Sequence, residues 1–92
     1  MHLVVVTVSI EPGQVEASRV ALREQVVPRV TASPGFAGGY WTAGADETVG
    51  LSFVLFDTEE NAQAGADMAR NFPTPPGVTI KSVEVREVIE QA

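Results

Sequence analysis

Apolar and polar residues along the chain follow two periods, one typical of strands and one typical of helices. Apolar residues occupy every even position from Val4 to Ile10, which places them on one face of an extended strand. Leu22, Val26 and Val30 recur at four-residue spacing, which predicts an apolar stripe along a helix. The whole pattern predicts strands at residues 3–10, 36–43, 48–56 and 78–89, and helices at residues 14–31 and 57–70.

The predicted elements follow the order β-α-β-β-α-β, with a hairpin in the middle. This order predicts a single α+β, ferredoxin-like domain over residues 1–92, in which a four-stranded antiparallel sheet carries both helices on one face. The strand at residues 48–56 is apolar on both faces. Because a small antiparallel sheet usually keeps one face in water, we expect a homodimer in which a partner subunit covers the face without helices.

Two local patterns refine these elements. Asp57 followed three residues later by Glu60 is typical of a capping box, so we expect Asp57 to be the N-cap of the second helix. Strict alternation in the last strand places Lys81 on the same face as Val83 and Val85. The length and charge of that strand suit an edge or a subunit-crossing position.

The segment from Pro34 to Trp41 joins the first helix to the second strand and holds the only Tyr and the only Trp. Pro34 follows the end of the helix, whose last turn should be kinked or loosened by Pro28, because proline lacks an amide donor. Gly38 and Gly39 leave space above the strand. The segment therefore marks the expected binding surface.

Composition and charge exclude several classes of partner. The net charge is −6, from six basic and twelve acidic residues, which argues against nucleic acid and against anionic membrane surfaces. The absence of cysteine excludes disulfides, thiol nucleophiles and thiolate metal sites. No apolar run approaches the ~20 residues of a membrane span, and the start of the chain does not resemble a signal peptide. We therefore expect a cytoplasmic protein, and its abundant Ala, Gly, Val and Arg hint at a bacterial source.

Three residues are weak candidates for catalysis. His2 has the only side chain that ordinarily titrates near neutral pH, but a solvated residue at a mobile terminus is the more frequent case. A lone histidine without nearby carboxylates also predicts no metal site. Tyr40 and Trp41 are neighbours on a strand and must point to opposite faces, so one packs under the helices and the other faces the dimer interface or a cavity. Core or interface packing is the competing interpretation for both.

Other polar and aromatic residues are candidates for ligand binding. Thr7, Ser9 and Ser52 carry hydroxyls on otherwise apolar strands, where cross-strand hydrogen bonding is the commoner use. Phe72 begins a stiff, proline-rich loop that is able to cover a pocket. Arg19 lies three residues after Glu16 on the first helix, so a surface ion pair between them is expected.

The chain resembles the antibiotic biosynthesis monooxygenase-like (ABM) group of the dimeric α/β-barrel superfamily. The residues that carry this resemblance span nearly the whole chain and are Ile10-Glu11-Pro12-Gly13, Ser33-Pro34-Gly35-Phe36, Gly38-Gly39-Tyr40-Trp41 and Phe56-Asp57-Thr58-Glu59-Glu60. The resemblance implies a homodimer whose two sheets close into a barrel. It also implies a ligand cavity in each subunit, between the sheet and the helices or loops.

The resemblance implies an activity only loosely. Its oxygenating members need no cofactor and position a phenolic substrate with polar cavity residues, to which Tyr40 and Trp41 are loose parallels. Its haem-degrading members use an Asn on the first strand and a Trp and a His on or after the second helix. Those three residues are missing from the corresponding segments of this chain, which argues against haem degradation.

Three hypotheses about function follow. The first is a cofactor-independent monooxygenase-like enzyme or isomerase acting on a small aromatic or quinol-type molecule. The second is a dimer that binds a small ligand without catalysis, for example in a stress response. The third is a structural or interaction module whose barrel interior is filled by side chains. The fold resemblance motivates the first hypothesis. The second is motivated by the absence of a group of acidic and basic side chains that would converge on one site. Apolar residues on both faces of the strands motivate the third.

Overall fold

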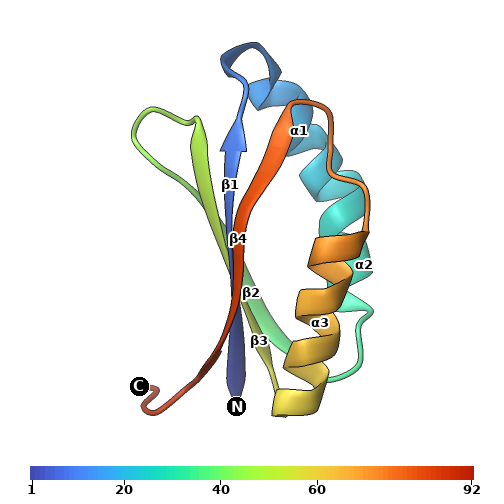
Figure 1. Ribbon diagram of the computed structural model, residues 1–92, viewed down its shortest axis with the longest axis vertical. Coiled ribbons are helices and arrows are strands. Elements are labelled where there is room, and N and C mark those ends of the chain that lie inside the picture. The colour runs from blue at the N-terminus through green and yellow to red at the C-terminus, as the bar shows by residue number, and fades with distance from the viewer.

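The computed structural model describes residues 1–92, which form one sheet with helices on one of its faces (Figure 1). The strands are β1 (His2–Ile10), β2 (Phe36–Ala43), β3 (Val49–Phe56) and β4 (Val78–Glu87). The first helical region contains a 3-10 turn (Pro12–Gln14), α1 (Val15–Ala21), a π-helical segment (Leu22–Val26) and α2 (Val27–Thr31), and the second is α3 (Glu59–Asn71). The predicted ferredoxin-like α+β fold is confirmed, and every predicted boundary lies within two residues of the observed one.

The sheet has the order β2-β3-β1-β4, and all neighbouring strands are antiparallel. Val4 in β1 lies opposite Val54 on one side and Val85 on the other. The pairing of β1 with β4 shifts by one residue at Lys81, which is a β-bulge on an edge strand. The expected strict alternation in β4 is therefore wrong. Residues before Lys81 point to the opposite face from the one that alternation predicts, so Ile80, not Lys81, lies on the helix side with Val83.

The first helical region is continuous but changes its winding ahead of Pro28. Within the π-helical segment the amide of Val27 bonds to the carbonyl of Leu22, five residues earlier. Pro28 has no amide to continue the α-helical ladder, and the wider turn that precedes it absorbs this interruption. The expected loosening by Pro28 thus occurs before the proline, and the helix continues to Thr31.

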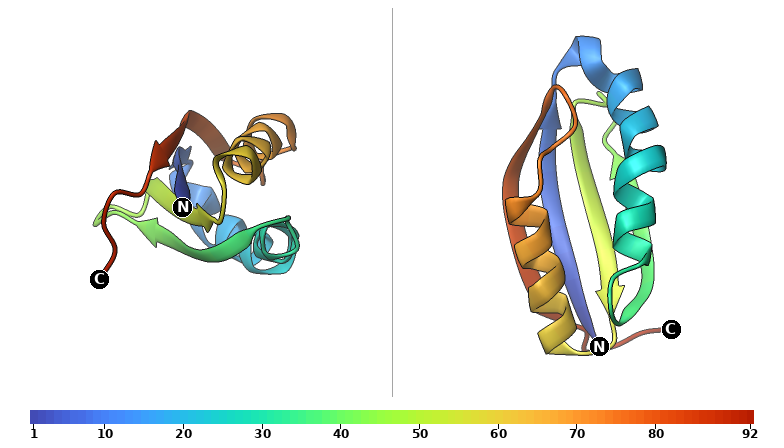
Figure 2. Two further views of the ribbon diagram at one scale, coloured as in Figure 1. Left: turned by 90° about the horizontal axis from the view of Figure 1, so that it is seen from below. Right: turned by 90° about the vertical axis from the view of Figure 1, so that its right-hand side faces the viewer.

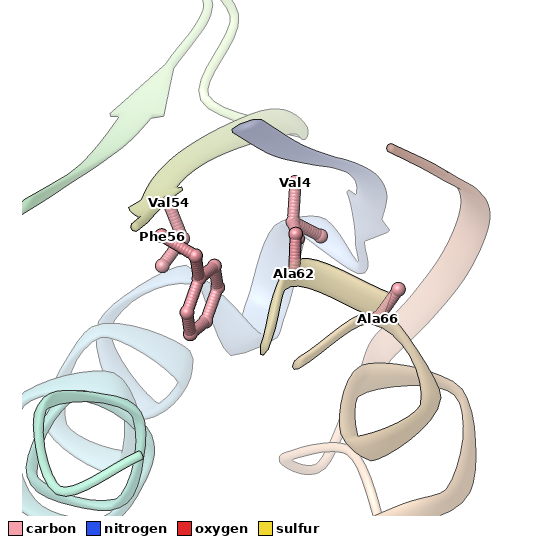
Figure 3. Packing of buried hydrophobic residues seen from close by; sticks show 5 residues of the cluster. All are labelled: Val4, Val54, Phe56, Ala62 and Ala66. Atoms are coloured by element: carbon pink, nitrogen blue, oxygen red, sulfur yellow. The ribbon is translucent and has the colours of Figure 1, made fainter. Parts of the chain in front are cut away.

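Small residues bring α3 close to the sheet over β1 and β4. The buried core consists of Val4, Val54, Phe56, Ala62 and Ala66, with the Phe56 ring extending from β3 beneath the helices (Figure 3). A Cβ atom added to Gly65 would lie 2.6 Å from the tip of that ring, so the glycine leaves the space that Phe56 fills. By contrast, the first helical region touches the sheet mainly where α2 meets β2.

The opposite face of the sheet carries no helix (Figures 1 and 2). The odd-numbered residues of β1 point to this face together with Tyr40, Leu51, Phe53 and Leu55. The central residues of this open face are half-buried by their neighbours, whereas Tyr40 is 75% exposed. The open face is thus apolar at its centre, as expected from the sequence.

Two local expectations are wrong. The N-cap of α3 is Thr58, whose hydroxyl accepts a hydrogen bond from the amide of Asn61 at 3.1 Å, while Asp57 Oδ1 accepts one from the Asn61 side chain at 2.8 Å. Arg19 pairs with Glu47 at 3.7 Å, not with Glu16, because the β2–β3 hairpin brings Glu47 to the helix. None of the helices is both long enough and apolar enough to cross a membrane.

Candidate functional site

A cavity of about 430 Å³ lies between the sheet and the first helical region, where that region stands away from the sheet. Its floor is the helix side of all four strands, and its walls are the two helical regions and the loop after α3. In the right-hand view of Figure 2 the first helical region and α3 stand apart, and β1 and β3 are seen between them. Most of the lining is aliphatic or aromatic, as is usual for a small-molecule site of about 300–1,000 Å³.

The aromatic residues of β2 are divided between the two faces of the sheet. Trp41 lies opposite Ser52 on the helix side, packs against the core and lines the cavity. Tyr40 lies opposite Phe53 on the open face. A Cβ atom on Gly39 would lie 2.9 Å from the Trp41 ring, so this glycine makes room for the indole. Trp41 is therefore the aromatic residue of this segment that belongs to the cavity.

The predicted hydroxyl residues do not converge on one site. Ser52 lines the cavity, and its hydroxyl makes no hydrogen bond within the chain. Thr7 and Ser9 lie on the open face of β1, on the same side as Tyr40. The cavity also contains Ser18, a buried residue that the sequence did not single out, but its hydroxyl already donates to the carbonyl of Val15 at 2.7 Å. Ser52 is thus the one residue of these four that both lines the cavity and has a hydroxyl without a hydrogen-bond partner in the chain.

His2 lies outside the cavity lining. The expectation of a solvated, mobile residue is wrong, because His2 belongs to β1 and its side chain is only 17% exposed. Its Nε2 lies 3.4 Å from Glu59 Oε2 at the start of α3, and its Nδ1 is buried without a partner. The contact with Glu59 joins the start of β1 to the start of α3, and Glu59 is the one carboxylate that pairs with His2. No cluster of three or more potential metal ligands occurs in the chain.

Phe72 and Arg29 form a bridge at the rim of the cavity. The guanidinium of Arg29 in α2 lies 4.4 Å from the centre of the Phe72 ring, which is a cation–π contact. Both side chains line the cavity, and Phe72 is 47% exposed. The contact ties the first helical region to the proline-rich loop after α3. The loop therefore begins at the rim of the cavity, and its ability to cover the cavity stays a prediction.

Three arginines line the cavity, and the sequence did not predict this grouping. Arg19, Arg23 and Arg29 all belong to the first helical region. Arg19 is paired with Glu47, which is the only non-glycine residue with a positive φ, at 63°. Spacing along the helix places Arg19 and Arg23 one turn apart, but only the structure places the cavity beneath them.

No model of a known protein family matches the chain, and no curated protein matches its sequence. Solved structures with the same fold do exist. The haem-degrading protein MhuD from Mycobacterium tuberculosis, solved with two haems bound in its active site, has 18% identity and a TM-score of 0.77, over 100% of this chain and 99% of that one. A dimeric ferredoxin-like protein from an uncultured marine organism has 11% identity and a TM-score of 0.69, over 100% and 98%.

A third structure with this fold is named after the group that the sequence resembles. It is a protein from Nitrosomonas europaea proposed to be an antibiotic biosynthesis monooxygenase, with 16% identity and a TM-score of 0.69, over 98% of this chain and 100% of that one. At these identities the likeness establishes the fold. The ferredoxin-like fold that the sequence resemblance predicts is confirmed.

Proposed function

We propose that this protein is a homodimer that binds a flat, largely apolar aromatic molecule in the cavity of each subunit. The observation that carries this proposal is the cavity itself: about 430 Å³ of space beside Trp41 and Phe56, with a free hydroxyl at Ser52. An indole and a phenyl ring favour stacking with a planar ligand. The free hydroxyl of Ser52 supplies one hydrogen bond to a phenol or carbonyl group of the ligand.

The open face of the sheet supports the dimeric part of the proposal. Leu51, Phe53 and Leu55 form an apolar strip there that no element of the same chain covers. Contiguous apolar surface of this kind usually marks a protein interface. One structure of the same fold is itself named as a dimeric ferredoxin-like protein. Pairing two open faces would close the two sheets into the barrel predicted from the sequence.

Filling the cavity should weaken ligand binding. Ala69 lines the cavity, so the variant Ala69→Phe should reduce the affinity for 2-naphthol, a neutral two-ring phenol, by about tenfold or more, because the new ring occupies the binding volume. Ala64 lies on the same helix, is exposed and does not line the cavity, so Ala64→Phe is the matched control. Isothermal titration calorimetry measures both. Absence of binding to the wild-type protein, or equal affinity in both variants, would contradict the proposal.

A second candidate function is cofactor-independent oxygenation of such a ligand. It is favoured by the shared fold with a protein proposed to be an antibiotic biosynthesis monooxygenase. In this reaction an anthrone-type CH₂ group is oxidised to a carbonyl, and O₂ is reduced to that carbonyl oxygen and one molecule of water. The substrate supplies all four electrons. The cavity offers no histidine, and its one carboxylate, Glu47, is engaged by Arg19, so the acidity of the substrate itself must provide the reactive anion.

Oxygen uptake separates this second candidate from simple binding. With anthrone as substrate, the wild-type protein should consume about one O₂ per anthrone faster than buffer does, and Ala69→Phe should return the rate to that of buffer. An oxygen electrode measures both. A protein that binds 2-naphthol but does not accelerate uptake is a binding protein, not an oxygenase.

Haem is a poor match for this cavity. The lining contains no histidine, tyrosine or cysteine, and Met68 is the only side chain there that ordinarily ligates haem iron. His2 lies outside the lining. The residues of this cavity therefore agree with the argument against haem degradation made from the sequence. The space in the cavity also argues against a structural module with a filled interior.

A further inference from the structure

The rim of the cavity concentrates positive charge in an acidic protein. The chain has six basic and twelve acidic residues, yet three of the six basic residues line this one cavity. The lining contains only one carboxylate, that of Glu47. Basic residues therefore outnumber acidic ones in the lining, whereas acidic residues outnumber basic ones in the chain as a whole. The contrast arises mainly from the scarcity of carboxylates, because only one of the twelve acidic residues lines the cavity.

Two of these arginines have no anionic partner. The ion pairs of the chain are Arg19 with Glu47, Arg70 with Asp67, Arg86 with Glu84, and His2 with Glu59. Arg23 and Arg29 form none, although carboxylates outnumber cations in the chain. Arg29 contacts the face of the Phe72 ring, which fixes its guanidinium at the rim. The single carboxylate of the lining, Glu47, is already paired with Arg19 at 3.7 Å.

We infer that the ligand is an aromatic oxyanion, with its rings in the apolar cavity and its carboxylate or phenolate group at the rim beside Arg23 and Arg29. This inference rests on the proposed binding function and specifies the ligand class. Guanidinium groups bind carboxylates through two parallel hydrogen bonds, and these bonds gain strength where apolar walls reduce contact with water. At the rim the apolar lining of the cavity reduces this contact on one side only, because Arg23 and Arg29 are themselves exposed.

A matched pair of ligands tests the charge alone. 2-Naphthoate and 2-naphthamide have the same rings and nearly the same shape, but only the first carries a negative charge. The wild-type protein should bind the carboxylate about tenfold to a hundredfold more tightly than the amide, given the usual strength of hydrogen bonds between charged groups. This preference should shrink as salt is raised, because the rim is in contact with water.

Three variants locate the source of the preference. Arg23→Gln and Arg29→Gln should each reduce the affinity for 2-naphthoate by about tenfold and leave the affinity for 2-naphthamide nearly unchanged. Lys81→Gln is the matched control, because Lys81 is an unpaired cation at the bulge of β4 and does not line the cavity. Lys81→Gln removes the same net charge and should change neither affinity by more than about twofold. Calorimetric titration of both ligands against all four proteins measures these effects.

The outcomes separate this inference from the proposal on which it rests. If neither naphthyl compound binds, the proposed binding function fails. If both bind equally, or if Lys81→Gln changes the preference as much as Arg23→Gln does, the function stands and the assignment of an anionic ligand is overturned. Selective loss of carboxylate binding in the two arginine variants supports the inference.

Discussion

Replacing Phe56 with Ala should lower the free energy of unfolding by about 3–5 kcal/mol. The ring is only 2% exposed and is the largest fully buried side chain of the protein, so its removal leaves a cavity at the contact between β3 and α3. Only seven of the 92 residues are buried, so the remaining core has little with which to compensate. Urea denaturation followed by circular dichroism, at a fixed protein concentration, measures the change.

Phe72→Ala is the matched control for this prediction. Phe72 is 47% exposed, so the same truncation there should cost no more than about 1 kcal/mol. The space at Gly65 provides an independent check. Gly65→Ala should destabilise the wild-type protein, because the new methyl group meets the Phe56 ring, and should do so less in a Phe56→Leu background. Equal losses from Phe56→Ala and Phe72→Ala would contradict the assignment of Phe56 to the core.

An aspartate at position 53 should convert the proposed dimer into monomers. Phe53 lies on β3 between Val5 and Tyr40, near the centre of the open face. Burying a carboxylate there without a partner costs several kcal/mol, which raises the dissociation constant of the dimer about a thousandfold. Sedimentation velocity should therefore record a dimer for the wild-type protein and a monomer for Phe53→Asp.

The control for this variant adds the same charge elsewhere. Gln63 is exposed on α3, on the other side of the sheet, so Gln63→Asp should remain dimeric. Circular dichroism checks that Phe53→Asp retains its sheet, since the substitution lies outside the buried core. A monomeric wild-type protein, or a dimeric Phe53→Asp variant, would contradict the proposed interface.

The fold could be predicted from the sequence because the strands and helices differ clearly in period. In β1 the apolar residues from Val4 to Ile10 repeat every second position, and in β3 those from Val49 to Leu55 do the same. The errors occur where a local interaction competes with the pattern. The bulge at Lys81 reverses the alternation of β4, and the hydroxyl of Thr58 caps α3 one residue after the expected Asp57.

The candidate site was less accessible to sequence reasoning. Each face of β2 has a glycine two residues before an aromatic residue, so periodicity could not decide between Tyr40 and Trp41. The pairing of Trp41 with Ser52 decides it, because pairing fixes which face each residue occupies. The arginines at the rim were missed for a different reason. Helical spacing indicates that Arg23 is on a surface, but not that the helix there stands away from the sheet.

The arginines at the rim and the aromatic wall of the cavity come from different layers of the protein. Trp41 and Phe56 belong to the sheet and pack in or against the core, whereas Arg23 and Arg29 are exposed on the helices. Exposed helical positions tolerate substitution at little cost to stability. A single mutation in the first helical region can thus change the charge of the molecule that is accepted, while the shape requirement and the fold persist. Natural selection can adjust the two properties separately, and proteins of this fold can diverge in ligand without passing through an unstable intermediate.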